Sequence, residues 1–71
     1  MDKVVVIGGS GFLGSHTADE LSRRGFKVQI FDAVESPWLR ADQTMVVGDI
    51  LDGDALRQAL QGAKAVYHFA G

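Results

Sequence analysis

Residues 4–14 decide the fold, and they read VVVIGGSGFLG. The first four form a continuous aliphatic, β-branched run, which is typical of a strand buried on both faces in a parallel sheet. The glycines that follow satisfy two spacings, Gly9-x-Gly11-x-x-Gly14 and Gly8-x-x-Gly11-x-x-Gly14. Such a loop between a strand and a helix binds pyrophosphate, because glycines permit the tight turn, the close backbone approach and the helix–strand packing.

The apolar spacing of the rest of the chain predicts two helices and three further strands. The first helix carries Leu13, Thr17 or Ala18, and Leu21 on its apolar stripe, and Gly25 ends it. The predicted elements are strands 4–7, 27–31, 44–47 and 65–69, a helix over 12–24, and a helix that follows an Asp52 cap and ends at Gly62. A loop covers residues 33–43. This order predicts right-handed crossovers onto an open parallel α/β sheet.

Composition and charge exclude several classes of protein. The chain has 71 residues, of which 46% are hydrophobic and 23% charged, so it predicts one small globular unit. A net charge of −2 leaves no basic surplus for nucleic acid or a membrane surface. Without cysteines there is no disulfide framework, and the two histidines lie too far apart for a zinc spacing. No apolar run approaches membrane-spanning length, so we expect a cytoplasmic protein.

An acidic residue closes the second predicted strand. Asp32 lies 24 positions after Gly8, where the dinucleotide fingerprint places a carboxylate that accepts hydrogen bonds from the adenosine ribose. Its charge would repel a 2′-phosphate, which favours NAD over NADP. Alternatively, the glycines only make a tight turn and Asp32 is a solvated strand end. A Walker phosphate loop is excluded because no Gly-Lys-Ser/Thr follows the glycines.

Four ordered segments resemble the extended short-chain dehydrogenases/reductases, the NAD-dependent epimerase/dehydratase family. The segments are GGSGFLGSH, VQIFD, GDILD and VYHFAG. They are similar to the family's glycine signature, second strand, adenine contact and fourth strand. The resemblance implies a partial Rossmann fold, with about four parallel strands in the order 3-2-1-4 and two helices, in which residues 1–71 are the N-terminal part of the dinucleotide-binding domain. Two departures are Ile7, in the usual threonine position, and a short loop over residues 33–43.

The same resemblance implies the cofactor contacts. The amides of Phe12 and Leu13 would bind pyrophosphate, and Asp32 would bind the ribose. Asp49 and Ile50 would contact the adenine, although Asp49 alone reads equally well as a turn residue. The end of the fourth strand would lie along the ribose and diphosphate. The expected cofactor-binding residues are Gly8, Gly11, Phe12, Leu13, Gly14, Asp32, Asp49, Ile50, Phe69 and Ala70.

Catalysis in this family uses a tyrosine paired with a lysine four residues later. Tyr67 is the one tyrosine of the sequence, and position 71 is glycine, so no such pair is present. The resemblance therefore implies the cofactor-binding portion of a longer oxidoreductase that acts on a nucleotide sugar or similar substrate. We expect the chain to bind NAD without turnover. The alternatives are a non-catalytic dinucleotide-sensing module and an α/β interaction domain that binds no nucleotide.

Several residues outside the motif carry further expectations. We expect His16 on the surface, and Tyr67 and His68 packed in the core of the fourth strand. Trp38 either covers an apolar patch or flanks the adenine. The fourth strand would be an apolar sheet edge, which predicts self-association by strand pairing or by exchange through the loop around Pro37.

Overall fold

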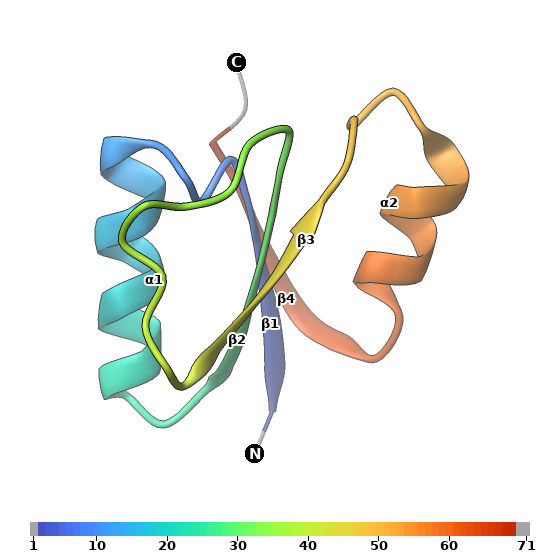
Figure 1. Cartoon of the computed structure of the whole chain (residues 1–71). Helices are drawn as coiled ribbons and strands as arrows, with labels where there is room; N and C mark the ends of the chain where they lie inside the picture. The colour runs from blue at the N-terminus through green and yellow to red at the C-terminus, as the bar shows by residue number, and fades with distance from the viewer. Residues whose placement is uncertain (1, 70–71) are drawn as a thin grey trace.

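The computed structural model describes residues 2–69 and contains one four-stranded sheet and two helices (Figure 1). The elements are β1 (Lys3–Ile7), α1 (Phe12–Arg23), β2 (Lys27–Asp32), β3 (Gln43–Val47), α2 (Gly53–Leu60) and β4 (Ala63–His68). All strand pairs are parallel, and the strand order is β3-β2-β1-β4. The predicted partial Rossmann fold is confirmed.

The two helices cover opposite faces of the sheet (Figure 1). Val4 and Val6 pack in one cluster with Ala18 and Leu21 of α1. The residues between and after them, Val5 and Ile7, pack with Ala59 of α2 on the other face. Successive side chains of a strand point to opposite faces, so a strand between two helical layers must be apolar at every position. This explains the VVVI run, whose residues are at most 3% exposed.

Capping residues predicted from the sequence mark the ends of both helices in the structure. Gly25 and Gly62 follow the two helices with φ of +92° and +75°, a region that glycine adopts at little cost. Asp52 caps α2, because its side chain accepts the Ala55 N–H at 3.2 Å. Three strands begin before their predicted starts, at Lys3, Gln43 and Ala63.

The early start of β3 has a tertiary cause. The Gln43 side chain is buried, and its Nε2 donates to Asp19 Oδ1 at 3.1 Å and to Ser22 Oγ at 3.0 Å, both on α1. A polar residue whose partners lie on a distant helix gives no strand signal in the sequence. At the other edge, Ala63 pairs with Lys3 before a register shift in the β1–β4 ladder. β4 correspondingly ends at His68, one residue before the predicted end.

Three predictions of burial are wrong. Leu13 lies in the first turn of α1 and is 67% exposed, so the buried side chains of the stripe are Ala18 and Leu21. Tyr67 is 40% exposed and His68 is exposed as well. Both lie on β4, an edge strand whose one neighbour in the described sheet is β1. An edge strand receives less cover than a central one, and that difference depends on strand order rather than on local pattern.

Candidate functional site: the carboxyl edge of the sheet

The carboxyl ends of all four strands meet at one edge of the sheet. Three backbone hydrogen bonds join the residues that follow the strands to their neighbours: Gly8 N to Phe31 O at 2.8 Å, Gly48 N to Asp32 O at 2.9 Å, and Phe69 N to Ile7 O at 2.7 Å. The glycine loop, Asp32 and the segments after β3 and β4 are thereby placed side by side. In open α/β sheets, ligands bind at this edge where the strand order reverses, which here lies between β1 and β4.

The glycines of the loop serve different purposes. Gly8 turns the chain off β1 with φ of +80°. A Cβ on Gly14 would lie 2.8 Å from Gly9 Cα and closer still to Gly8 O, so this position admits no side chain while helix and loop stay in contact. A Cβ on Gly11 would meet only Gly8 O, at 3.6 Å. The protein therefore does not need glycine at position 11 for its own packing, and the space beside it is open to a ligand.

The first turn of α1 presents free backbone donors next to that space. Gly11 is the N-cap and has no side-chain capping bond, and the first intrahelical bond runs from Ser15 N to Gly11 O at 2.8 Å. The N–H groups of Phe12 and Leu13 find no acceptor among residues 2–69. Free N–H groups and the positive end of the helix dipole favour an anionic group. This is where the sequence predicts the pyrophosphate.

Asp32 is held beside the glycine loop. Its Oδ2 accepts the N–H of Ser10 at 3.0 Å, and its Oδ1 accepts the N–H of Ala33 at 2.6 Å. The Ser10 hydroxyl donates to Val34 O at 2.7 Å. A carboxylate has about four acceptor positions, so lone pairs remain on both oxygens for ribose hydroxyls. Sequence reasoning missed Ser10, because a serine in a glycine-rich turn is ordinary and its partners lie more than 20 residues away.

The segment after β3 lies next to Asp32 through the Gly48 bond. Asp49 Oδ1 accepts the N–H of Leu51 at 2.9 Å, and Asp49 O accepts the N–H of Asp52 at 2.9 Å. These are the bonds of a turn residue, one of the two interpretations of Asp49. Ile50 is at the surface. An adenine contact by these two residues stays a prediction.

Phe69 and Ala70 were predicted to lie along the ribose and diphosphate. Phe69 follows β4, is partly exposed and reaches the edge through its bond to Ile7 O. Ala70 lies outside the described residues.

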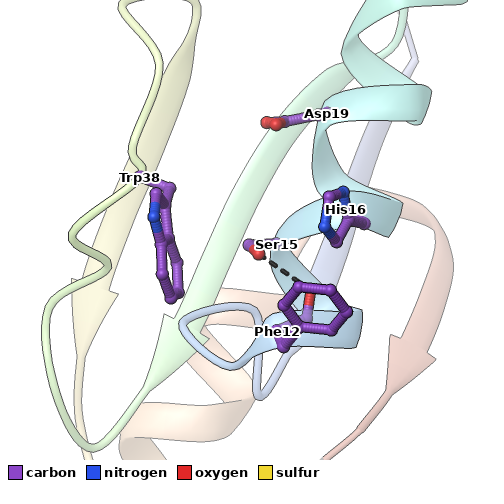
Figure 2. Close-up of a pocket in the computed structure, with 5 residues that line it drawn as sticks. All are labelled: Phe12, Ser15, His16, Asp19 and Trp38. Atoms are coloured by element: carbon purple, nitrogen blue, oxygen red, sulfur yellow. Dashed lines mark hydrogen bonds between the residues drawn. The ribbon is translucent and has the colours of Figure 1, made fainter.

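A separate cavity of about 150 Å³ lies between α1 and the β2–β3 loop (Figure 2). Trp38 of the loop faces one side of the helix, and the Phe12 and His16 rings meet edge to face at 4.5 Å. Trp38 lines this cavity opposite α1 and is 53% exposed, so both of its alternatives stay predictions, whereas His16 is exposed as predicted. The remaining lining residues are Ser15 and Asp19. The Ser15 hydroxyl donates to Phe12 O and Asp19 Oδ1 accepts from Gln43, while three of the five lining residues, Phe12, His16 and Trp38, contribute rings.

Charged groups elsewhere on the described chain lie on its surface. Glu20, near the far end of α1, bonds to Arg24 at 3.1 Å and Arg23 at 3.0 Å, and the hydrogen bond from Arg24 is the main cause of its lowered pKa. Among residues 2–69, no group of three histidines or acids is placed to hold a metal ion. No helix in the same range has the length and apolar character needed to cross a bilayer.

The fold and the loop geometry are those of a Rossmann-type dinucleotide-binding domain. The family model described as "NAD dependent epimerase/dehydratase family" matches residues 4–71. The chain therefore belongs to the NAD-dependent epimerase/dehydratase family.

Individual relatives agree with this assignment. The chain is 39% identical over 71 residues to a 3-beta-hydroxysteroid dehydrogenase of Mycolicibacterium neoaurum, covering 99% of this chain and 19% of that protein. It is 38% identical to the mouse sterol-4-alpha-carboxylate 3-dehydrogenase, decarboxylating, and the match covers 96% of this chain and 18% of that protein. The crystal structure of UDP-glucose 4-epimerase from Brucella ovis in complex with NAD superposes with a TM-score of 0.91 at 36% identity. The superposition covers 100% of this chain and 23% of that one. The chain thus spans about a fifth of the length of these relatives.

Proposed function

We propose that the chain binds the adenosine diphosphate half of NAD and is the cofactor-binding portion of an oxidoreductase of the epimerase/dehydratase type. The observation that carries the proposal is the open space at Gly11, bordered by the free amides of Phe12 and Leu13 and by the Asp32 carboxylate. The NAD complex of the Brucella ovis epimerase supports the choice of cofactor, because its fold matches the whole chain.

In this proposal the chain binds and orients the cofactor. The helix amides neutralise the diphosphate, Asp32 accepts bonds from the ribose, and the segment after β3 borders the adenine. When bound, NAD supplies oxidation and reduction of the substrate. Tyr67 lies on an edge strand with no lysine four residues later, so the 71-residue chain alone has no turnover in this proposal.

The proposed substrate carries a hydroxyl or carbonyl group, as a nucleotide sugar does. A sterol is a second candidate, favoured by the two dehydrogenases at 39% and 38% identity. A non-catalytic dinucleotide-sensing module of the same fold is the alternative for the whole protein. The cytoplasmic location and the absence of a nucleic-acid partner remain predictions from the sequence.

Calorimetric titration with NAD tests the proposal through Gly11→Val. Gly11 has φ of −78° and ψ of 175°, an extended backbone that valine adopts readily, and its Cβ has room. The protein should fold normally and bind NAD at least about tenfold more weakly, because the side chain fills the space for the diphosphate. Gly53→Val is the matched control, since a Cβ there meets nothing within 4 Å. Unchanged NAD affinity in folded Gly11→Val would place the site elsewhere.

Preference for NAD over NADP is tested with Asp32→Ala. The 2′-phosphate carries a charge of about −1.5 to −2, and the Asp32 carboxylate repels it. Wild type should bind NAD more tightly than NADP, and the substitution should narrow the ratio of the two affinities. The ratio is the quantity to measure, because Asp32 also holds Ser10 and Ala33, and loss of those bonds affects both cofactors. Equal affinities in wild type would contradict the preference.

A further inference from the structure

We propose that Ser10 is a positioning residue for ribose recognition, which acts by fixing the Asp32 carboxylate and the turn that follows β2. The inference rests on the proposed function, because it requires the ribose of the bound nucleotide to lie at Asp32. Ser10 itself touches no ligand in this proposal.

Ser10 bonds to both sides of that turn. Its N–H donates to Asp32 Oδ2 at 3.0 Å, before the turn, and its hydroxyl donates to Val34 O at 2.7 Å, after it. The Ala33 N–H, between them, donates to Asp32 Oδ1 at 2.6 Å. Both carboxylate oxygens are therefore held by backbone donors, and the backbone that supplies one of those donors is held by the Ser10 hydroxyl.

Besides these bonds, the Gly48 N–H donates to Asp32 O at 2.9 Å at the start of the turn, and no further hydrogen bond among residues 2–69 holds Ala33 or Val34. Ala33 and Val34 are both exposed, so apolar packing contributes little to their position. Ser10 is only 7% exposed, and its short bond to a single carbonyl is a defined restraint. A carboxylate whose rotamer is already fixed loses less conformational entropy on binding, so the ribose hydroxyls gain more from their bonds to it.

The consequence is specific to the ribose hydroxyls. Without the Ser10 hydroxyl, residues 33–34 are freer to move and the Asp32 carboxylate samples other orientations. The contribution of the ribose hydroxyls to binding should then fall, while contacts to the phosphates and the base stay as they are. A general loss of stability would weaken every contact alike.

Two nucleotides separate these effects. ADP and 2′,3′-dideoxy-ADP share base and phosphates and differ in the hydroxyls that Asp32 would accept. We expect wild type to bind ADP about tenfold more tightly than the dideoxy compound, the range for hydrogen bonds to a charged group. Ser10→Ala should reduce this affinity ratio about threefold or more, and leave the affinity for 2′,3′-dideoxy-ADP unchanged.

Ser15→Ala is the matched control. Ser15 is also 7% exposed, and its hydroxyl also donates to one backbone carbonyl, Phe12 O at 2.9 Å. It has no bond to Asp32 or to the turn, so its loss should leave the ratio unchanged. Ser10→Cys, which keeps the size of the side chain but donates weakly, should lower the ratio as Ser10→Ala does, and it serves if the alanine variant does not fold.

Each result decides a different question. An unchanged ratio in folded Ser10→Ala or Ser10→Cys overturns the inference, and so does a fall in dideoxy-ADP affinity, which would mean that Ser10 contacts the phosphates or the base. A wild type that binds neither ADP nor NAD refutes the proposed function instead. In that case amide hydrogen exchange of the ligand-free protein still tests the restraint: Ala33 N–H should exchange faster in Ser10→Ala than in wild type or Ser15→Ala, and equal rates would refute it.

Discussion

The first crossover, β1-α1-β2, buries more of its residues than the second, β3-α2-β4. α1 has twelve residues with four buried, whereas Ala59 is the one buried residue among the eight of α2. Four residues of β1 are buried, and no residue of β4 is. The first unit thus carries most of the packing and the glycine loop, while the second covers the other face of the sheet and supplies both of its edges.

Glycines in the helices of the two units show the same contrast. Gly14 of α1 lies against the backbone of Gly8 and Gly9, whereas Gly53 of α2 has open space around it. Close contact between helix and loop brings the amides of the first turn to the carboxyl edge of the sheet. The feature that makes the first unit tight is therefore also the one that positions the site.

The largest expected effect comes from breaking that contact. Gly14→Ala should lower the free energy of unfolding by about 1–3 kcal/mol or more, because its Cβ meets backbone atoms that cannot rotate away. Gly53→Ala should be neutral or stabilising by up to about 1 kcal/mol, since alanine restricts the unfolded chain and meets nothing in the fold. Urea unfolding of both variants measures the difference. Equal stability of Gly14→Ala and wild type would show that the helix can separate from the loop at little cost.

The second prediction concerns the exposed edge of the second unit. Val66, Tyr67 and Phe69 leave an apolar edge at β4, and an uncovered edge is a template for strand pairing. We expect the 71-residue chain by itself to form a dimer or larger assembly, through β4 or by exchange through the loop around Pro37. Val66→Lys should shift it towards monomer, because a charge on an edge strand opposes pairing.

Sedimentation equilibrium at micromolar concentration tests this prediction. Thr44→Lys places the same charge on β3, the opposite edge, and should leave the assembly intact. A wild-type chain that is monomeric and well folded would contradict the prediction. If Thr44→Lys dissociates the assembly and Val66→Lys does not, the interface lies at β3 instead.

Most of the fold could be predicted from the sequence because the patterns that specify its helices, strands and turns involve residues close together in the chain. The apolar run of β1, the glycine loop, the Asp52 cap and the glycines after both helices each depend on neighbours in the chain. Asp32 was predicted as a candidate site residue for the same reason, since it closes a strand 24 positions after Gly8. Strand order followed from the crossover rule and the family resemblance.

What the sequence did not reveal depends on distant partners. The hydroxyl of Ser10 and the amide of Gln43 act across more than 20 residues, and neither leaves a periodic pattern. Tyr67 and His68 were assigned to the core because their strand is apolar, yet burial of a strand depends on which elements cover it. Leu13 has helical spacing, but Gly14 and Ser15 are the buried residues of the first turn of α1 and Leu13 is exposed.

The smallest expected effect is electrostatic and lies at the end of α1 far from the site. Glu20 bonds to Arg24 and Arg23, with all three side chains more than half exposed, so water screens much of the attraction. The hydrogen bond from Arg24 lowers the pKa of Glu20 below its usual value of about 4.3. A carboxyl whose pKa is lower in the folded state stabilises the fold above its unfolded pKa, and that contribution is lost as the pH falls through the folded value.

Glu20→Gln should therefore lower the melting temperature slightly at pH 7, and the difference from wild type should shrink as the pH falls below about 4.3, where Glu20 of the wild type also becomes neutral. Thermal unfolding at several pH values measures it. High salt should reduce the difference at pH 7, because the pairs are exposed and screened. A difference that stays constant down to pH 3 would mean that the substitution acts through packing or helix propensity, and that the first unit owes nothing to this cluster of charges.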